Sequence, residues 1–255
     1  MKIVTILCQK GGVGKTTFTV NLGKILSNRG FKTLIIDTDP QGNVSTYLNF
    51  NKDEENIINS TDLLEKNYDK KIGSLSENLY TIPSNKSILK HNDEKIIGGP
   101  KLNRAKDFLA SYHFDIVIID TPPTISSLTQ EALAASDYYL IPAKPEFLAV
   151  EGVSQAMSFA KITISSIKKA DPIFLGVVLN QVDTRRASFK DFETELKFLL
   201  SDKMFNSKIS QLTEIADSPF YSKTVLDFKE QSRARLEFLE FSNEFIERVG
   251  LWKGH

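Results

Sequence analysis

The sequence predicts an α/β fold with a mostly parallel, doubly wound sheet and helices on both faces. Two observations predict it. Short, nearly continuous apolar segments recur along the chain, and longer segments with helical periodicity separate them. Strands of a parallel sheet are covered on both faces, so they are apolar throughout instead of alternating with polar residues. The 255 residues are 41% hydrophobic, which suffices for a full core, and we expect residues 1–255 to form one domain.

The elements follow in chain order. Residues 2–7 predict a buried strand, and residues 15–29 a helix that Gly30 ends. Further strands are expected at residues 33–37, 79–83, 115–120, 138–143 and 174–182. A polar segment around residues 49–78 predicts a surface insertion with one or two short helices, and residues 92–101 predict a loop. Apolar residues among charges predict a long amphipathic helix, with or without a break, around residues 227–249.

Composition excludes several classes of protein. Lys plus Arg is 32 and Asp plus Glu is 32, so a histone-like or acidic-tail protein is excluded, whereas DNA binding through a local patch is not. The single cysteine, Cys8, can form neither an internal disulfide nor a multi-cysteine metal site within one chain. We found no signal peptide, and no apolar segment approaches the roughly 18 residues of a spanning helix. A cytoplasmic protein is expected.

The segment from Gly11 to Thr17 (Gly-Gly-Val-Gly-Lys-Thr-Thr) lies between the first strand and the first helix. Glycines let backbone N–H groups close around a phosphate, and the helix N-terminus adds partial positive charge. Lys15 can reach the β- and γ-phosphates, and the Thr16 hydroxyl can ligate Mg²⁺. The segment therefore predicts a site for ATP or ADP with Mg²⁺, formed by Gly11, Gly12, Val13, Gly14, Lys15, Thr16 and Thr17. The strict phosphate-loop pattern needs a glycine where Gln9 stands.

Residues 9–17 resemble the deviant Walker A motif of the ParA/MinD family of ATPases. Residues 36–43 (Ile-Asp-Thr-Asp-Pro-Gln-Gly-Asn) resemble the second motif of the ParA branch, and residues 115–123 resemble its Walker B strand and following loop. Residues 82–85, 135–142 and 218–224 are weaker matches in the same order along the chain. The resemblance implies a P-loop NTPase fold and slow ATP hydrolysis that a partner protein stimulates.

The resemblance also implies roles for four side chains. Lys10 is the signature lysine that crosses the interface of an ATP-bound homodimer, where a second cation stabilises transition-state charge. Asp39 orients or activates the attacking water, and Asp37 lies close to the Mg²⁺ shell. An alternative is that one of the two aspartates only caps a turn with Pro40 and Gly42. Asp120 holds Mg²⁺, directly or through water.

Two further segments complete the expected nucleotide site. By resemblance, residues 121–123 sense the γ-phosphate, as switch loops do. The resemblance also implies that Asn180 lies at the adenine edge, where an amide can both donate and accept hydrogen bonds. Many relatives place a proline against the base in a later segment, and this sequence has Ser210 there.

The expected function is partition of a plasmid or chromosome. By resemblance, the ATP dimer holds non-specific double-stranded DNA, and a ParB-like centromere-binding protein stimulates hydrolysis and release, which implies association with the nucleoid. Residues 184–255 carry 12 Lys or Arg and 12 Asp or Glu, so a basic face must be assembled by folding and dimerisation. Lys223, Arg233 and Arg235 are the first candidates for DNA contact.

Two alternatives stay open. One is an ATPase of the same family that positions a protein cargo, with identical chemistry. The other is a nucleotide-switched regulatory protein without DNA binding. Membrane binding is disfavoured, because glutamates dominate the polar face of the last helix and have the wrong charge for anionic lipid.

Overall fold

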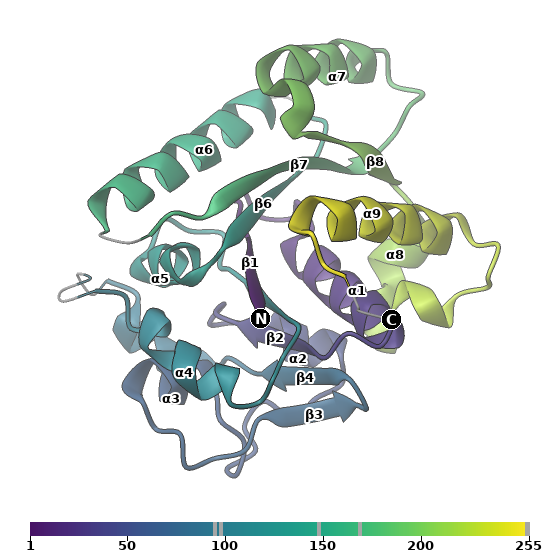
Figure 1. Ribbon diagram of the computed structural model, residues 1–255. Coiled ribbons are helices and arrows are strands. Elements are labelled where there is room, and N and C mark those ends of the chain that lie inside the picture. The colour runs from purple at the N-terminus through teal and green to yellow at the C-terminus, as the bar shows by residue number, and fades with distance from the viewer. Residues whose placement is uncertain (94–95, 97–98, 147–148, 168–169, 253–255) are drawn as a thin grey trace.

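A single sheet runs through the computed structural model, which describes residues 1–93, 96, 99–146, 149–167 and 170–252 (Figure 1). Within these residues the sheet has eight strands in the order β3-β4-β2-β5-β1-β6-β7-β8. All neighbours are parallel except β3 and β4 at one edge. The strands are β1 Lys2–Ile6, β2 Thr33–Asp37, β3 Gly73–Ser76, β4 Leu79–Ile82, β5 Ile116–Asp120, β6 Tyr138–Ala143, β7 Ile173–Val182 and β8 Met204–Ser210. The mostly parallel α/β fold expected from the sequence is confirmed.

Helices cover both faces of the sheet. The α-helices are α1 Lys15–Asn28, α2 Asn43–Tyr47, α3 Ser60–Glu65, α4 Lys106–Ala110, α5 Ser127–Ala135, α6 Ala149–Ser166, α7 Ala187–Leu200, α8 Thr213–Asp217 and α9 Arg233–Val249. Helices α1 and α9 share a hydrophobic cluster with one face, whereas α3, α4 and α5, and then α6 and α7, pack on the other. In Figure 1, α1 and α5 lie on opposite sides of β1. The sheet is therefore doubly wound.

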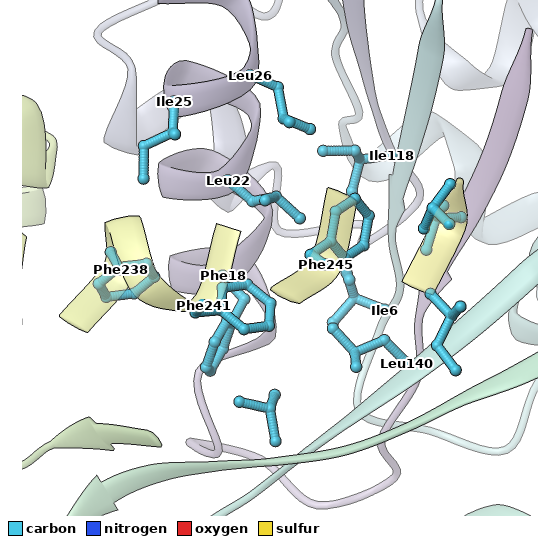
Figure 2. Close-up of a cluster of buried hydrophobic side chains, with 14 of the residues drawn as sticks. Ile6, Phe18, Leu22, Ile25, Leu26, Ile118, Leu140, Phe238, Phe241 and Phe245 are labelled. Atoms are coloured by element: carbon cyan, nitrogen blue, oxygen red, sulfur yellow. The ribbon is translucent and has the colours of Figure 1, made fainter. Parts of the chain in front are cut away.

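Four buried phenylalanines fix α1 against α9: Phe18, Phe238, Phe241 and Phe245 (Figure 2). The Phe18 and Phe241 rings meet edge to face with centroids 5.0 Å apart. Burying each ring contributes about 1.5–3 kcal/mol by transfer from water. Because α1 follows the glycine-rich segment directly, this packing also fixes the position at which that segment ends.

The C-terminal helix begins later than the sequence predicts. A 3₁₀ turn, Val225–Asp227, precedes α9, which starts at Arg233. The Ser232 hydroxyl caps it by accepting a hydrogen bond from the Arg235 N–H at 3.5 Å, and Gly250 ends it in the left-handed conformation with φ 64°. The capping hydroxyl and the glycine define the helix more sharply than the apolar periodicity does.

The polar segment around residues 49–78 is not confined to the surface. It contains α3, as expected, but also the edge strand β3, and Ile58, Leu63 and Leu64 are buried in the core beside α5. Strand β8 was not expected as a strand, because its mixed polar sequence hides an edge strand whose N–H groups at Asn206 and Ser207 donate to Glu244 of α9. Part of the loop expected at residues 92–101 lies outside the described residues.

Candidate functional site

The glycine-rich segment connects β1 to α1 and exposes the start of that helix. Gly12 and Gly14 have φ of 73° and 97°, a backbone conformation that side chains rarely adopt. A Cβ atom on Gly14 would collide with the Asn180 amide. Gly14 is also the N-cap of α1, and no side chain caps the helix there. Its first N–H groups are therefore oriented to bind an anion.

Lys15 is buried beneath this segment, with 7% of its surface exposed. Its Nζ lies 3.5 Å from the Lys10 carbonyl oxygen. Burial lowers the pKa of Lys15, and the nearby Asp120 carboxylate opposes that shift. The nearby carboxylate neutralises this buried ammonium group only in part. The group therefore attracts an anion such as phosphate.

Asp120 ends β5 directly beside the segment. Its Oδ2 accepts a hydrogen bond from the Thr16 hydroxyl at 2.7 Å, and its Oδ1 accepts one from Thr19 at 3.2 Å. Burial raises the pKa of Asp120 to about 6, against the opposing effects of Thr16 and Lys15. A carboxylate and a hydroxyl in contact fit Mg²⁺, which takes one or two protein oxygens together with phosphates and water. The residues present therefore fit the metal.

Asp37 ends β2, the strand beside β5, but its carboxylate is turned to the backbone. Oδ1 accepts the Asp39 N–H at 2.8 Å and Oδ2 accepts the Val44 N–H at 3.1 Å. Burial raises the pKa of Asp37 well above its usual range, and the charge of Asp120 adds to that rise. Asp37 thus ties the loop after β2 to the first turn of α2. In the turn with Pro40 and Gly42, weighed above for one of the two aspartates, it is the Asp39 backbone oxygen that accepts the Gly42 N–H, at 2.9 Å.

Asp39 lies in the loop that Asp37 supports. Its Oδ1 accepts the Gln41 N–H at 2.9 Å, and the residue is 7% exposed. It contributes to the wall of an open cavity of about 290 Å³. The cavity is lined by Gly11, Gly12, Gly14, Lys15, Thr16, Thr17, Asp39, Asn43, Pro123 and Gln181. The candidate phosphate and metal groups of the glycine-rich segment thus meet the candidate water-activating Asp39 at one cavity.

Two amide side chains at the end of β7 contact the same segment. Asn180 Nδ2 donates to the Val13 carbonyl oxygen at 2.7 Å, and Gln181 Nε2 donates to the Gly12 carbonyl oxygen at 2.8 Å. Val13 itself is buried. Ser210, which stands where relatives were expected to carry a proline, donates through its N–H and hydroxyl to Glu237 of α9.

Comparisons with known proteins agree with this geometry. A family model described as an AAA domain matches residues 1–173. The sporulation initiation inhibitor protein Soj of Bacillus subtilis is 31% identical over 252 residues, covering 95% of this chain and 97% of Soj. The chain belongs to the ParA/Soj family of partition ATPases.

Other proteins resemble the chain over nearly its whole length. The chromosome partitioning protein ParA of Caulobacter vibrioides is 29% identical, covering 97% of this chain and 95% of that protein. A crystal structure of a Borrelia burgdorferi plasmid partition protein bound to AMPPNP superposes with a TM-score of 0.79 and 25% identity, covering 97% and 99% of the two chains. A Cyanothece apo McdA structure has the same fold, with a TM-score of 0.78 and 21% identity.

In this ParA-family chain, the signature lysine of the family motif is bound to an acidic partner. Lys10 Nζ lies 3.0 Å from Glu146 Oε1, and Lys144 Nζ lies 3.7 Å from Glu146 Oε2. Lys10 is 39% exposed. Hydrogen bonding to Lys10 lowers the pKa of Glu146. An exposed pair of this kind is weak, about 0–1 kcal/mol, so it leaves Lys10 able to exchange partners.

The three candidate DNA residues of the ParA-family chain have different environments. Lys223 is exposed, with Nζ 6.0 Å from the ring centroid of the exposed Tyr221. Arg233 pairs with Glu237 at 2.7 Å. Arg235 donates to the carbonyl oxygens of Leu226 and Phe228, both at 3.2 Å, so its guanidinium holds the segment before α9.

Four functional candidates of this ParA-family chain escape inspection of the sequence: Thr19, Asn43, Glu146 and Gln181. Thr19 could have been found from its place one turn after Thr16, where a second hydroxyl can reach the same carboxylate. The others come near the cavity or Lys10 only through folding. No group of three or more His, Cys, Asp or Glu side chains that could hold a metal occurs within the described residues. Within them, none of the helices combines the length and apolarity that crossing a bilayer requires.

Proposed function

We propose that this chain is a DNA-partition ATPase that binds ATP with Mg²⁺ at Gly11–Thr17 and dimerises in the ATP-bound form through Lys10. The ATP dimer holds non-specific double-stranded DNA, and a ParB-like partner bound at a centromere-like site stimulates hydrolysis and release. The protein then cycles on and off the nucleoid. The observation that carries the proposal is the meeting of Lys15, Thr16 and Asp39 at one cavity, with Asp120 in contact with Thr16.

Each residue has a task in this proposal. The N–H groups of the segment and the Lys15 ammonium bind the phosphates, and Thr16 with Asp120 holds Mg²⁺. When bound, Mg²⁺ neutralises charge on the β- and γ-phosphate oxygens. Asp39 accepts a hydrogen bond from the attacking water and orients it. Lys10 leaves Glu146 and reaches the partner's nucleotide, where it stabilises transition-state charge.

The DNA-binding surface of the ATP dimer is proposed to include Lys223 and Arg233. Arg235 contributes less in the monomer, because its guanidinium already donates to two carbonyl oxygens. Asn180 belongs to the nucleotide site. Full-length similarity to the chromosome partitioning protein of Caulobacter vibrioides and to the plasmid partition protein of Borrelia burgdorferi supports DNA as the cargo.

The decisive experiment is DNA binding by the Asp39→Ala variant with ATP and Mg²⁺, compared with ADP, over a series of salt concentrations. Loss of the water-orienting carboxylate should trap the ATP dimer and slow hydrolysis at least about 100-fold. The trapped dimer should bind unrelated duplexes equally and only with ATP. Affinity should fall steeply with salt, because each phosphate contact releases counterions.

Asp171→Ala is the matched control, since Asp171 is exposed and lies before β7. It should hydrolyse ATP and bind DNA as the wild type does. In the Asp39→Ala background, Lys223→Ala or Arg233→Ala should reduce the salt slope by about one if either residue contacts a phosphate. A demonstrated ATP dimer that binds no DNA would overturn the partition proposal and favour a nucleotide-switched regulatory protein.

A further inference from the structure

The end of β7 departs from regular strand geometry at Gln181. Side chains of consecutive strand residues ordinarily point to opposite faces of a sheet. Gln181 has φ 54°, in the left-handed region that residues other than glycine seldom adopt. As a result, the amides of Asn180 and Gln181 both reach the glycine-rich segment. A conformation that costs free energy persists where the surrounding contacts hold it, often at functional sites.

The two amides hold two consecutive carbonyl groups. Gln181 Nε2 donates to the Gly12 oxygen at 2.8 Å, and Asn180 Nδ2 donates to the Val13 oxygen at 2.7 Å. In a planar trans peptide group the C=O and the N–H point in opposite directions. Holding the Gly12 and Val13 oxygens therefore turns the N–H groups of Val13 and Gly14 away from the amides.

That orientation is the one that phosphate binding needs. Successive backbone N–H groups facing the same way form a concave anion site. The position of Asn180 is itself fixed, because it is 3% exposed and packs where a Cβ on Gly14 would stand. Gln181 is half-buried and forms part of the cavity wall. One amide thus supports the loop from the core and the other from the cavity rim.

We propose that Asn180 and Gln181 form an amide clamp that sets the phosphate-binding conformation of the loop before nucleotide arrives. The inference rests on the proposed function, since the ligand is a nucleotide phosphate. Both are positioning residues that act through the Gly12 and Val13 peptide groups. Asn180 then affects nucleotide affinity through the phosphates instead of through the adenine edge.

The first test uses Gln181→Met, which keeps the length of the side chain and removes the donor. Loss of one hydrogen bond of about 1 kcal/mol should raise the Kd for Mg-ADP about fivefold to tenfold. The Kd for adenosine should stay within about twofold, because adenosine has no phosphate. Asn180→Ala should show the same split between ADP and adenosine. Gln155→Met is the matched control, since Gln155 is exposed on α6 and bonds only to Glu151 among the described contacts.

A second measurement needs no nucleotide. In the ligand-free wild type, ¹⁵N relaxation should give rigid order parameters near about 0.85 for Val13 and Gly14, and Gln181→Met should lower them below about 0.7. Glycine adopts the left-handed backbone conformation without a side-chain penalty. The Gln181→Gly variant should therefore unfold at no lower temperature than the wild type, and it should also lower the order parameters of Val13 and Gly14. That variant separates loss of the clamp from a folding defect.

Each result of the affinity and relaxation measurements either supports or overturns the amide clamp. Unchanged ADP affinity and unchanged order parameters in Gln181→Met would overturn the clamp. Equal loss of ADP and adenosine affinity in Asn180→Ala, with a rigid loop, would assign Asn180 to the base instead. If the wild type binds no nucleotide, the proposed function fails, and the order parameters alone judge whether the clamp holds the loop.

Discussion

Asp37 and Asp120 stand at equivalent places on neighbouring strands, paired in register at the ends of β2 and β5. Each follows two isoleucines and each is fully buried. Their partners nevertheless differ. Asp37 accepts two backbone N–H groups of the loop after its strand, whereas Asp120 accepts two hydroxyls of α1 and faces Lys15.

The difference teaches that two aspartates at the same edge of this sheet can have different surroundings, one bonded to the loop after its own strand and one bonded to the helix after the glycine-rich segment. The chain after β2 turns back over its own aspartate, so that carboxylate stabilises the loop that presents Asp39. The chain after β5 leads away through Thr121, whose hydroxyl donates to the Ile6 carbonyl oxygen at 2.7 Å. Asp120 is thereby left beside the glycine-rich segment. This is the carboxyl edge of the sheet, where ligands bind in folds of this kind.

The largest expected effect is on catalysis. Asp120→Asn should lower Mg²⁺-dependent ATP hydrolysis about 100-fold or more, because an amide is a poor ligand for Mg²⁺. Asp115→Asn, at the opposite end of β5, should keep the rate within about twofold after correction for folded protein. Steady-state phosphate release over a Mg²⁺ titration measures both. A rate close to that of the wild type in Asp120→Asn would place the metal elsewhere.

The next effect is on stability. Asp37→Ala should lower the free energy of unfolding by about 2–4 kcal/mol, because the Asp39 and Val44 N–H groups lose their acceptor. Asp37→Asn should cost less, since its amide oxygen still accepts one hydrogen bond. Urea denaturation of the metal-free protein measures the change. A variant as stable as the wild type that needs more Mg²⁺ would restore the metal-shell role expected from the resemblance.

The pH dependence of the metal-free protein is the third effect. Because the folded pKa of Asp120 is about 6, above the ordinary 3.8, the folded state binds the proton more tightly than the unfolded state. The contribution of Asp120 to stability should therefore fall by roughly 3 kcal/mol as pH rises from about 4 to 6 and stay level above that range. Asp37, whose pKa is also raised, adds a fall of its own. Asp120→Asn should reduce the fall, leaving the part due to Asp37. Carboxylates with lowered pKa values, such as Glu193 and Glu244, act in the opposite direction, so the comparison of the two proteins is what tests Asp120. The same pH dependence in Asp120→Asn as in the wild type would contradict the raised pKa of Asp120.

The smallest effect concerns Thr19. Thr19→Val removes one hydroxyl from Asp120 Oδ1 at nearly constant volume and should cost about 0.5–1 kcal/mol. The Asp120 pKa should rise further, which moves the end of the pH-dependent fall to higher pH. Thr33→Val is the control, because the buried Thr33 hydroxyl bonds to the Phe31 carbonyl oxygen, away from Asp120. Both variants can be followed by urea denaturation at several pH values.

The sequence by itself determined the parallel core strands, the glycine-rich loop and the identity of its lysine and threonine. These are local properties: continuous apolar segments, glycines with positive φ and a helix that begins at Lys15 depend on neighbouring residues. Residues 49–78 and β8 were predicted less well. The polar composition of residues 49–78 gives no sign that Ile58 and Leu63 are buried. The polar residues of β8 likewise hide an edge strand whose Asn206 N–H donates to Glu244 of α9.

Only the tertiary structure decided which of two similar aspartates supports a loop and which faces the phosphate loop. It also decided that Gln181 reaches the Gly12 carbonyl oxygen, that Glu146 binds Lys10 and that Arg235 donates to backbone carbonyls. Asp37 and Arg235 bond to backbone groups nine or fewer positions away, so their contacts depend on how the adjoining loop folds back. For Asp120, Gln181 and Glu146 the physical reason is distance along the chain. Hydrogen bonds and ion pairs between residues more than a hundred positions apart depend on how strands are ordered in the sheet, and that order is set by packing of the whole core.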